Sequence, residues 1–76
     1  MKASIEQINK WMAGEVVENS MFKLNDDVKI ISGNNIGAVG SVISLETVSS
    51  DPTYLIELVS GEDANVKQSE IEKIHS

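Results

Sequence analysis

The spacing of apolar residues changes once along the chain. Near the N-terminus, Ile5, Ile8 and Met12 recur every three or four positions, and Trp11 lies at the edge of the face that they form. This period is typical of an amphipathic helix. From residue 23 onward, short runs of branched and aromatic residues alternate with polar segments, which is typical of strands. The pattern therefore predicts one short helix followed by a β-rich unit.

The limits of the helix follow from its flanking residues. Ser4 and Gln7 have the spacing of a capping box, which predicts a helix over residues 4–13. Gly14 suits the position after a helix end. Alternatively, the helix continues through Val16 and tolerates the internal glycine at a cost of ~1 kcal/mol. The early end is favoured, because a longer helix would turn the next valine away from the apolar face.

Five strands are predicted in the remainder of the chain. They are separated by segments in which glycine, asparagine, aspartate and proline favour loops and turns. A connector over residues 15–22 precedes the first strand, and one turn of 3₁₀ helix over residues 68–70 precedes the last. The predicted strands cover residues 28–31, 38–45, 53–59, 64–67 and 71–74.

Short, closely spaced strands favour a closed sheet, because closure removes edges that would recruit other chains. We therefore expect a mainly β fold, a small five-stranded barrel with a short N-terminal α-helix over one open end. Residues 1–21 form the helix and connector and residues 22–76 the barrel, within a single compact domain. The predicted core consists of Val28, Ile30, Val39, Val42, Tyr54, Ile56, Leu58, Val66, Ile71 and Ile74.

Part of this unit resembles a known family. The segment Phe22–Ile30, followed by glycines at 33, 37 and 40, resembles the start of a KOW-type, SH3-like barrel. Gly37–Val42 resembles the KOW core, and Val66–Ile74 resembles the ending of such barrels, where a 3₁₀ turn precedes the last strand. The resemblance covers residues 22–75 and implies a small bacterial domain with this fold.

The resemblance also implies several roles. KOW domains in ribosomal proteins and transcription elongation factors contact RNA or protein, and similar barrels serve as accessory subunits, such as a small peripheral subunit of photosystem I. The glycine loop over residues 32–40 carries no basic residue. For this reason the fold is carried over from the family and the RNA-binding role is not.

Charge narrows the choice of partners. The 76 residues include 12 acidic side chains and 6 lysines with no arginine, so the net charge is −6. Nucleic acids and anionic membranes are disfavoured, because their binding requires basic patches. A protein with a basic or neutral surface is the expected partner. The absence of cysteine excludes disulfides, thiolate metal sites and thiol nucleophiles.

The first residues and the hydropathy indicate the compartment. The chain opens with Met1-Lys2-Ala3-Ser4 rather than with the apolar run of a signal peptide. No apolar stretch approaches the ~20 residues that span a bilayer. We therefore expect a cytoplasmic protein without membrane association. A homodimer is compatible with this small core, since small domains gain stability from oligomerisation.

No residue pattern predicts a catalytic, cofactor or metal site. The glycine loop lacks the lysine and hydroxyl residues of a phosphate-binding loop, and fits a strand-joining loop. The pairs Asp26-Asp27 and Glu62-Asp63 lack the spacing of calcium loops and fit solvated turns. His75, the only histidine, lies beside the C-terminus, where chain ends are rarely held in place. We therefore expect a protein that is not an enzyme.

Four apolar residues are candidates for contacting a partner protein: Trp11, Ile8, Met12 and Ile36. Tryptophan is enriched at interface hot spots, so an exposed helix face with Trp11 would form a docking surface. The alternative is that Trp11 packs against its own barrel. Ile36 lies at a loop tip, where it either contacts a partner or folds back to plug one barrel end.

Three functional hypotheses follow. The first is a non-enzymatic protein-binding module that acts as an accessory or regulatory subunit, with acidic side chains steering a basic partner. The second is a KOW-like module associated with RNA or ribosomes, for which the acidic balance is unfavourable. The third is an acidic inhibitor or immunity-type protein that blocks a basic surface on an enzyme.

Overall fold

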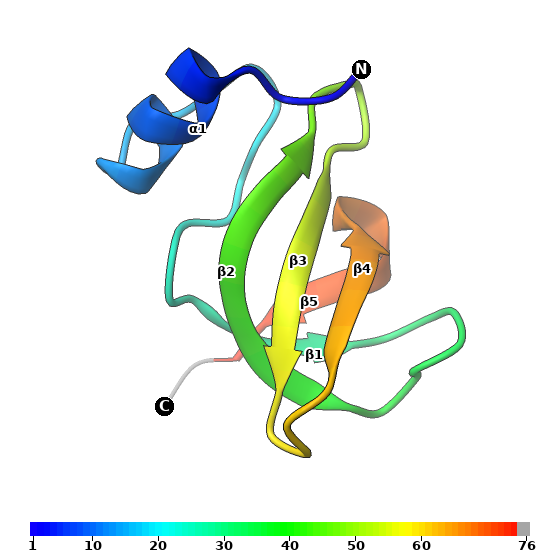
Figure 1. Ribbon diagram of the computed structural model, residues 1–76. Coiled ribbons are helices and arrows are strands. Elements are labelled where there is room, and N and C mark those ends of the chain that lie inside the picture. Colours follow the sequence, from blue (N-terminus) through cyan, green and yellow to red (C-terminus); the bar gives the residue numbers. More distant parts are fainter. Residues whose placement is uncertain (75–76) are drawn as a thin grey trace.

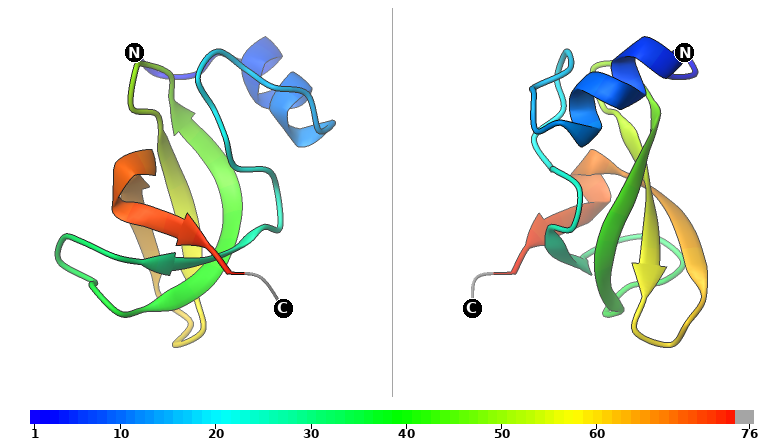
Figure 2. Two further views of the ribbon diagram at one scale, coloured as in Figure 1. Left: turned by 180° about the vertical axis from the view of Figure 1, so that it is seen from behind. Right: turned by 60° about the vertical axis from the view of Figure 1, so that its left-hand side comes forward.

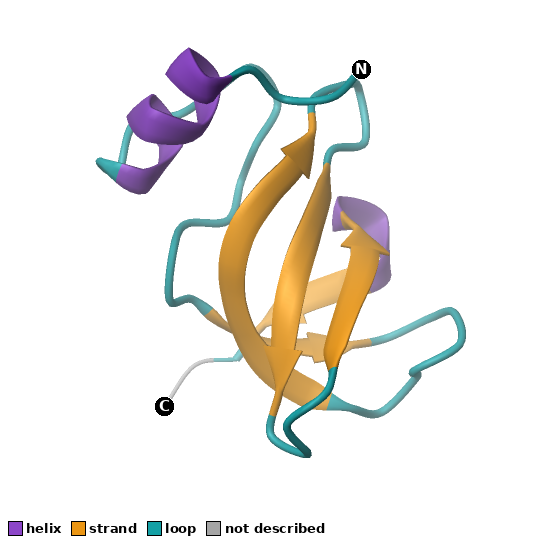
Figure 3. Ribbon diagram, in the orientation of Figure 1, coloured by secondary structure: helices purple, strands orange, loops and turns teal. Residues whose placement is uncertain are grey.

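The computed structural model describes residues 1–74, which form a mainly β fold with one helix (Figures 1 and 3). The fold class expected from the sequence is thus confirmed at the level of five antiparallel strands and one short N-terminal helix. In chain order the elements are α1 (Ile5–Met12), β1 (Asp27–Ile30), β2 (Val39–Thr47), β3 (Thr53–Leu58), β4 (Asp63–Lys67), the 3₁₀ turn η1 (Gln68–Glu70) and β5 (Ile71–Lys73).

Helix α1 begins and ends where its flanking residues predict. The Ser4 hydroxyl accepts from the Gln7 amide, and the Gln7 side chain accepts from the Ser4 amide, which completes the capping box. After Ala13 the chain leaves the helix through Gly14, whose φ of +91° is readily adopted only by glycine. The early helix end is therefore confirmed, and Val16 lies beyond it.

The strands form one antiparallel sheet in the order β4-β3-β2-β1-β5. Strand β2 is long and curved, so that β1 and β5 lie behind β3 and β4 and cross them (Figures 1 and 2). Two register shifts against β3, between Val42 and Ser44 and between Leu45 and Thr47, accompany this curvature. Among residues 1–74 no strand pairing joins β4 to β5, so closure into a barrel stays a prediction.

The core lies on the concave side of the sheet. Eight of the ten predicted core residues are buried there, but Val39 is half-buried and Ile74 is 36% exposed. These two predictions were wrong because Val39 shares the outer side of β2 with Ser41, and Ile74 lies past the end of β5. Buried apolar residues that were not predicted are Ala3, Trp11, Val17, Phe22, Leu45, Val48 and Ala64.

Residues before β1 supply several of these additions. Trp11 is 1% exposed, and its indole Nε1 donates to the Phe22 carbonyl at 2.8 Å. The Tyr54 ring of β3 packs near both aromatic rings, with its centroid 6.3 Å from that of Trp11 and 5.6 Å from that of Phe22. The helix and connector therefore pack on the sheet beside β2 (Figure 1).

Candidate interaction surfaces

The helix face that was a candidate docking surface is turned inward. Trp11 is buried and Ile8 is half-buried against the core, while Met12 is 50% exposed. A buried indole offers a partner no surface, so Trp11 follows the alternative of packing against its own sheet.

Ile36 is the one sequence candidate with a largely free side chain. It lies in the loop between β1 and β2 and is 68% exposed. It does not plug an end of the sheet. The next residue, Gly37, has a φ of +92°, which turns the chain back toward β2. Nothing else in this loop forms a defined apolar surface around Ile36, apart from Ile31, which is 42% exposed.

A polar cluster fastens the connector to the sheet. The Gln68 Oε1 atom accepts from the Met21 amide at 2.8 Å and from the Tyr54 hydroxyl at 2.6 Å. The Gln68 amide nitrogen donates to the Asn19 carbonyl at 3.1 Å. Burial raises the pKa of Tyr54, so its hydroxyl stays a neutral donor around neutral pH. The donors and acceptors of this cluster are paired with one another, which indicates that the cluster has a structural role in holding the connector on the sheet.

A second polar cluster joins the loop before β3 to η1. The Asp51 carboxylate accepts from the Ser69 hydroxyl at 2.7 Å and from the Ser69 amide at 2.9 Å. These two hydrogen bonds, with a smaller contribution from nearby Lys67, lower the pKa of Asp51 below its ordinary value. These hydrogen bonds join the loop before β3 to the turn before β5.

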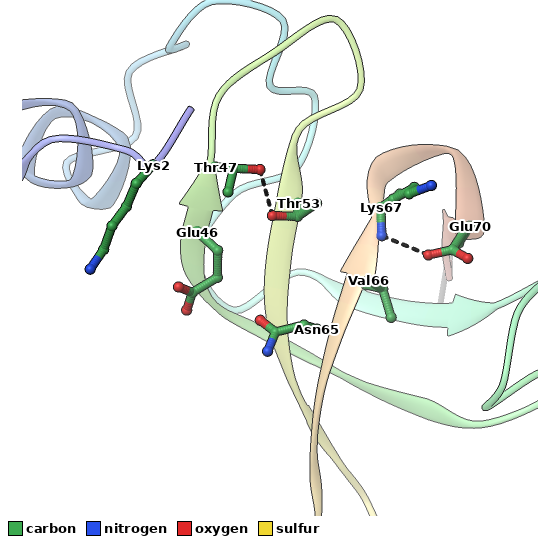
Figure 4. Close-up of a pocket in the computed structure, with 8 residues that line it drawn as sticks. All are labelled: Lys2, Glu46, Thr47, Thr53, Asn65, Val66, Lys67 and Glu70. Atoms are coloured by element: carbon green, nitrogen blue, oxygen red, sulfur yellow. Dashed lines mark hydrogen bonds between the residues drawn. The ribbon is translucent and has the colours of Figure 1, made fainter.

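Two grooves open on the surface. One, of about 470 Å³, crosses the outer side of β2, β3 and β4 and is also lined by Lys2 and Glu70 (Figure 4). In it the Thr47 and Thr53 hydroxyl oxygens lie 2.6 Å apart, and Glu70 accepts from the Lys67 amide at 2.8 Å. Within residues 1–74, no three histidine or acidic side chains are close enough to share a metal ion. His75 lies outside the described residues.

The other groove, of about 330 Å³, lies along the connector. Val16 and Met21 line it and are 71% and 76% exposed, whereas Phe22 beside them is buried. Met21 and Phe22 differ in this way because adjacent side chains of an extended segment point to opposite sides.

Strand register gathers acidic side chains that are far apart in the sequence. Asp27 of β1 pairs with Ser41 of β2, Ser41 with Glu57 of β3, and Glu57 with Asp63 of β4. These four residues, here called the acidic row, lie on the outer side of the sheet, and its three carboxylates are exposed. The Ser41 hydroxyl donates to Asp27 at 3.1 Å. Among residues 1–74 the ion pairs involve other carboxylates, those of Glu6 and Asp26.

The acidic row ends at β4 with two like charges opposite each other. Glu57 and Asp63 are directly opposite, one residue before and one after the pair in which the Leu58 amide donates to the Glu62 carbonyl. They therefore form a pair without backbone hydrogen bonds, in which side chains lie closest. Like charges directly opposite destabilise a sheet. Among residues 1–74 neither carboxylate forms an ion pair.

Partly exposed apolar side chains flank the acidic row. Val39 is half-buried and Val59 is 84% exposed, and their backbones are joined by a hydrogen bond of 3.0 Å. On the other side of the row, Ile43 and Leu55 are half-buried at the first register shift. Lys29, opposite Val39, is the cation nearest to this row in the strand register. The outer face thus combines carboxylates with apolar surface.

Sequence reasoning noticed Asp26-Asp27 and Glu62-Asp63 only as separate pairs in turns. The spacing of apolar residues could have placed Asp27, Glu57 and Asp63 on outward positions of their strands. It could not align them across strands, because the strand register depends on the loop lengths and on the irregularities in β2.

Comparison of the chain with protein-family models, curated proteins and solved structures finds no match in any of the three. None of the helices in residues 1–74 has the length and apolar character needed to cross a membrane.

Proposed function

We propose that this chain is a non-enzymatic protein-binding module whose outer sheet face binds a partner with cationic side chains. The observation that carries the proposal is the acidic row across four strands, flanked by partly exposed apolar residues. The proposal keeps two expectations from the sequence, a cytoplasmic location and an SH3-like barrel of the KOW type. The 3₁₀ turn directly before β5 supports the family resemblance.

The energetics of the row favour a cationic partner. In the free protein Glu57 and Asp63 repel each other across β3 and β4. A lysine or arginine placed between them would replace that repulsion by two attractions. Val39, Val59 and Leu55 would add apolar contact area beside the charges. Charge would then steer the encounter, and the apolar contacts would slow dissociation.

The same row also favours one alternative, an inhibitor or immunity-type protein that covers a basic surface of an enzyme. Three carboxylates in line would match a row of cations on such a surface. A role in RNA binding receives no such support, because this face would repel phosphates. The inhibitor role predicts loss of an enzyme's activity on binding, and the accessory role predicts that activity is kept.

The test is affinity capture from a native lysate, with and without nuclease, using three baits. The first is the wild-type chain. The second is Glu57→Gln/Asp63→Asn, which removes two charges of the row. The third is Glu15→Gln/Glu18→Gln, a control that removes two exposed charges from the connector. The affinity of each bait for the captured protein is then measured at low and high salt.

We expect a nuclease-resistant partner that binds the row variant about tenfold more weakly or worse, with the control unchanged. The row variant should be slightly more stable than wild type, by roughly 0.2–0.5 kcal/mol, because a like-charge pair is removed. A loss of binding therefore cannot be attributed to unfolding. Partners that disappear with nuclease, or equal binding by the two variants, would contradict the proposal.

A further inference from the structure

Strand β4 ends the sheet and leaves one backbone edge without a partner strand (Figures 1 and 3). The Leu58 amide donates to the Glu62 carbonyl, and the Gln68 amide donates to the Pro52 carbonyl, both at 2.8 Å. Backbone groups that face a neighbouring strand alternate along an antiparallel ladder. The even-numbered residues of β4 therefore face β3, and Asp63, Asn65 and Lys67 direct their amides and carbonyls to the open edge.

The residues on this edge are complementary to a second copy of themselves. If two β4 strands pair antiparallel with Asn65 opposite the Asn65 of a second copy, each Asp63 lies opposite a Lys67. The outward-facing backbone groups of both strands then meet, except for the Lys67 amide, which donates to Glu70. Ala64 lies opposite Val66 on the concave side, so the apolar and the charged faces also match.

Other two-fold registers lack this match. Centring the pair on Asp63 or on Lys67 places like charges opposite each other. Centring it on Ala64 or Val66 places Asn65 opposite a charged residue and leaves the opposite charges unpaired. Charged residues on an edge strand normally prevent association. Here the single register centred on Asn65 turns the same two charges into attractions.

This pairing would place a lysine of the second copy beside the acidic row. In strand order, Asp63 is the last residue of the row, opposite Glu57. In the paired sheet the Lys67 side chain of the second copy would lie on the other side of Asp63, and would offset the repulsion from Glu57. Lys67 and Asn65 are exposed on β4, and Lys67 forms no ion pair among residues 1–74 (Figure 4).

We propose that two copies of this chain associate through β4, in the antiparallel register centred on Asn65, to form one continuous sheet. This inference does not rest on the proposed function. The association is weak, for two reasons. The Lys67 amide is already bonded to Glu70 at 2.8 Å, and Ala64 and Val66 are already buried, so few hydrogen bonds and little apolar area are gained. Interfaces below ~1,000 Å² belong to the weak class.

The test is sedimentation equilibrium over a wide concentration range at low salt, with charge-reversal variants. Asp63→Lys gives an edge with two lysines, and Lys67→Asp gives an edge with two aspartates. Each variant alone should associate about tenfold more weakly than wild type or worse. An equimolar mixture of the two should form a heterodimer, because every charged pair is then attractive. Circular dichroism verifies that each variant is folded.

A backbone variant tests the edge without changing charge. Asn65→Pro removes an amide that faces away from β3, so the fold tolerates it, as edge strands tolerate proline. It should abolish association. A monomeric wild type at all concentrations, or equal association by wild type and Asn65→Pro, would overturn the proposal. Association reduced by Val16→Ser or Met21→Ser, and not by the β4 variants, would also overturn it and would assign the contact to the connector groove.

Discussion

Residues 1–22 and residues 27–73 are held in the protein by different means. The strands of the sheet are joined by regular ladders, and branched side chains from every strand share the core. The helix and connector have no ladder beyond a short bridge between Lys2 and Thr47. They are fastened by a few large side chains, chiefly Trp11 and Phe22, and by single hydrogen bonds to side chains such as Gln68.

The difference concerns how stability is distributed. In the sheet, each contact is one of many similar ones. The loss of a single surface contact therefore leaves most of the contacts between two strands in place. In the N-terminal region, one indole fills the space between helix and sheet, and one amide side chain accepts two hydrogen bonds. We therefore expect single substitutions to separate residues 1–22 from the sheet more easily than they separate two strands.

The largest effect should come from Trp11→Ala. The substitution removes a side chain that is 1% exposed and leaves the Phe22 carbonyl without its donor. We expect a loss of about 3–5 kcal/mol in the free energy of unfolding, measured by urea denaturation. Met12→Ala, at a half-exposed position of the same helix, is the control and should cost less than ~1 kcal/mol. Similar losses for both variants would show that the indole does not fasten the helix.

A change within the sheet tests the other side of the comparison. At Gly40 an added Cβ would collide with the Glu57 carbonyl and lie 2.8 Å from Ile56 Cγ2, so β2 and β3 must move apart. Gly40→Ala should therefore destabilise the protein by about 1–3 kcal/mol, measured in the same urea titration. Hydrogen exchange should increase first in β2 and β3. Faster exchange in the connector, and not in β2 and β3, would contradict the idea that residues 1–22 and the sheet are held by different contacts.

A smaller effect is expected from Gln68→Ala, which cuts the polar tie of the connector. The Tyr54 hydroxyl loses its acceptor and the Met21 amide keeps only a longer hydrogen bond of 3.3 Å to that hydroxyl, at a cost of about 1–3 kcal/mol, lower if water replaces the Gln68 amide. The diagnostic result is faster hydrogen exchange at the Met21 amide. Tyr54→Phe removes a hydroxyl that donates to Gln68 and accepts from the Met21 amide at 3.3 Å, but it keeps the shorter bond from Met21 to Gln68. Exchange at Met21 should therefore rise less than in Gln68→Ala.

The smallest effect should be the pH dependence contributed by Asp51. Hydrogen bonds from Ser69 hold the pKa of Asp51 below that of an unfolded aspartate, ~3.9. Its contribution is therefore complete above the unfolded pKa, and is lost as the pH falls through the lower folded pKa. The thermal midpoint of Asp51→Asn should approach that of wild type at low pH. Glu62→Gln, in an exposed turn, controls for the lost charge. If the difference in thermal midpoint between Glu62→Gln and wild type shrank equally at low pH, the role of Ser69 would be contradicted.

The sequence predicted the elements of this fold better than their packing. The capping box at Ser4, the helix end at Gly14 and the 3₁₀ turn before the last strand depend on residues close in the chain, and all three are confirmed. Leu45 was missed as a core residue because the register shift before it returns its side chain to the concave side. Strict alternation along β2 does not anticipate that shift.

The candidate surfaces were harder to predict for the same reason. For Ile36 the sequence left open a partner contact or a plug of one barrel end, and its 68% exposure excludes the plug. The exposure of Trp11 was left open, because the side of the helix that meets the sheet is decided by contacts with Phe22 and Tyr54. The acidic row was not predicted, because its members belong to four different strands.

What the sequence by itself determined is the set of local structures: one capped helix, five strands, their turns, and an acidic surface without arginine. These follow from periodicity, turn chemistry and charge, which act over a few residues. Only the tertiary structure decided that Trp11 is buried, that Asp27, Glu57 and Asp63 lie in one row, and that β4 is an open edge. Strand register and curvature bring distant residues together, and no local pattern encodes them.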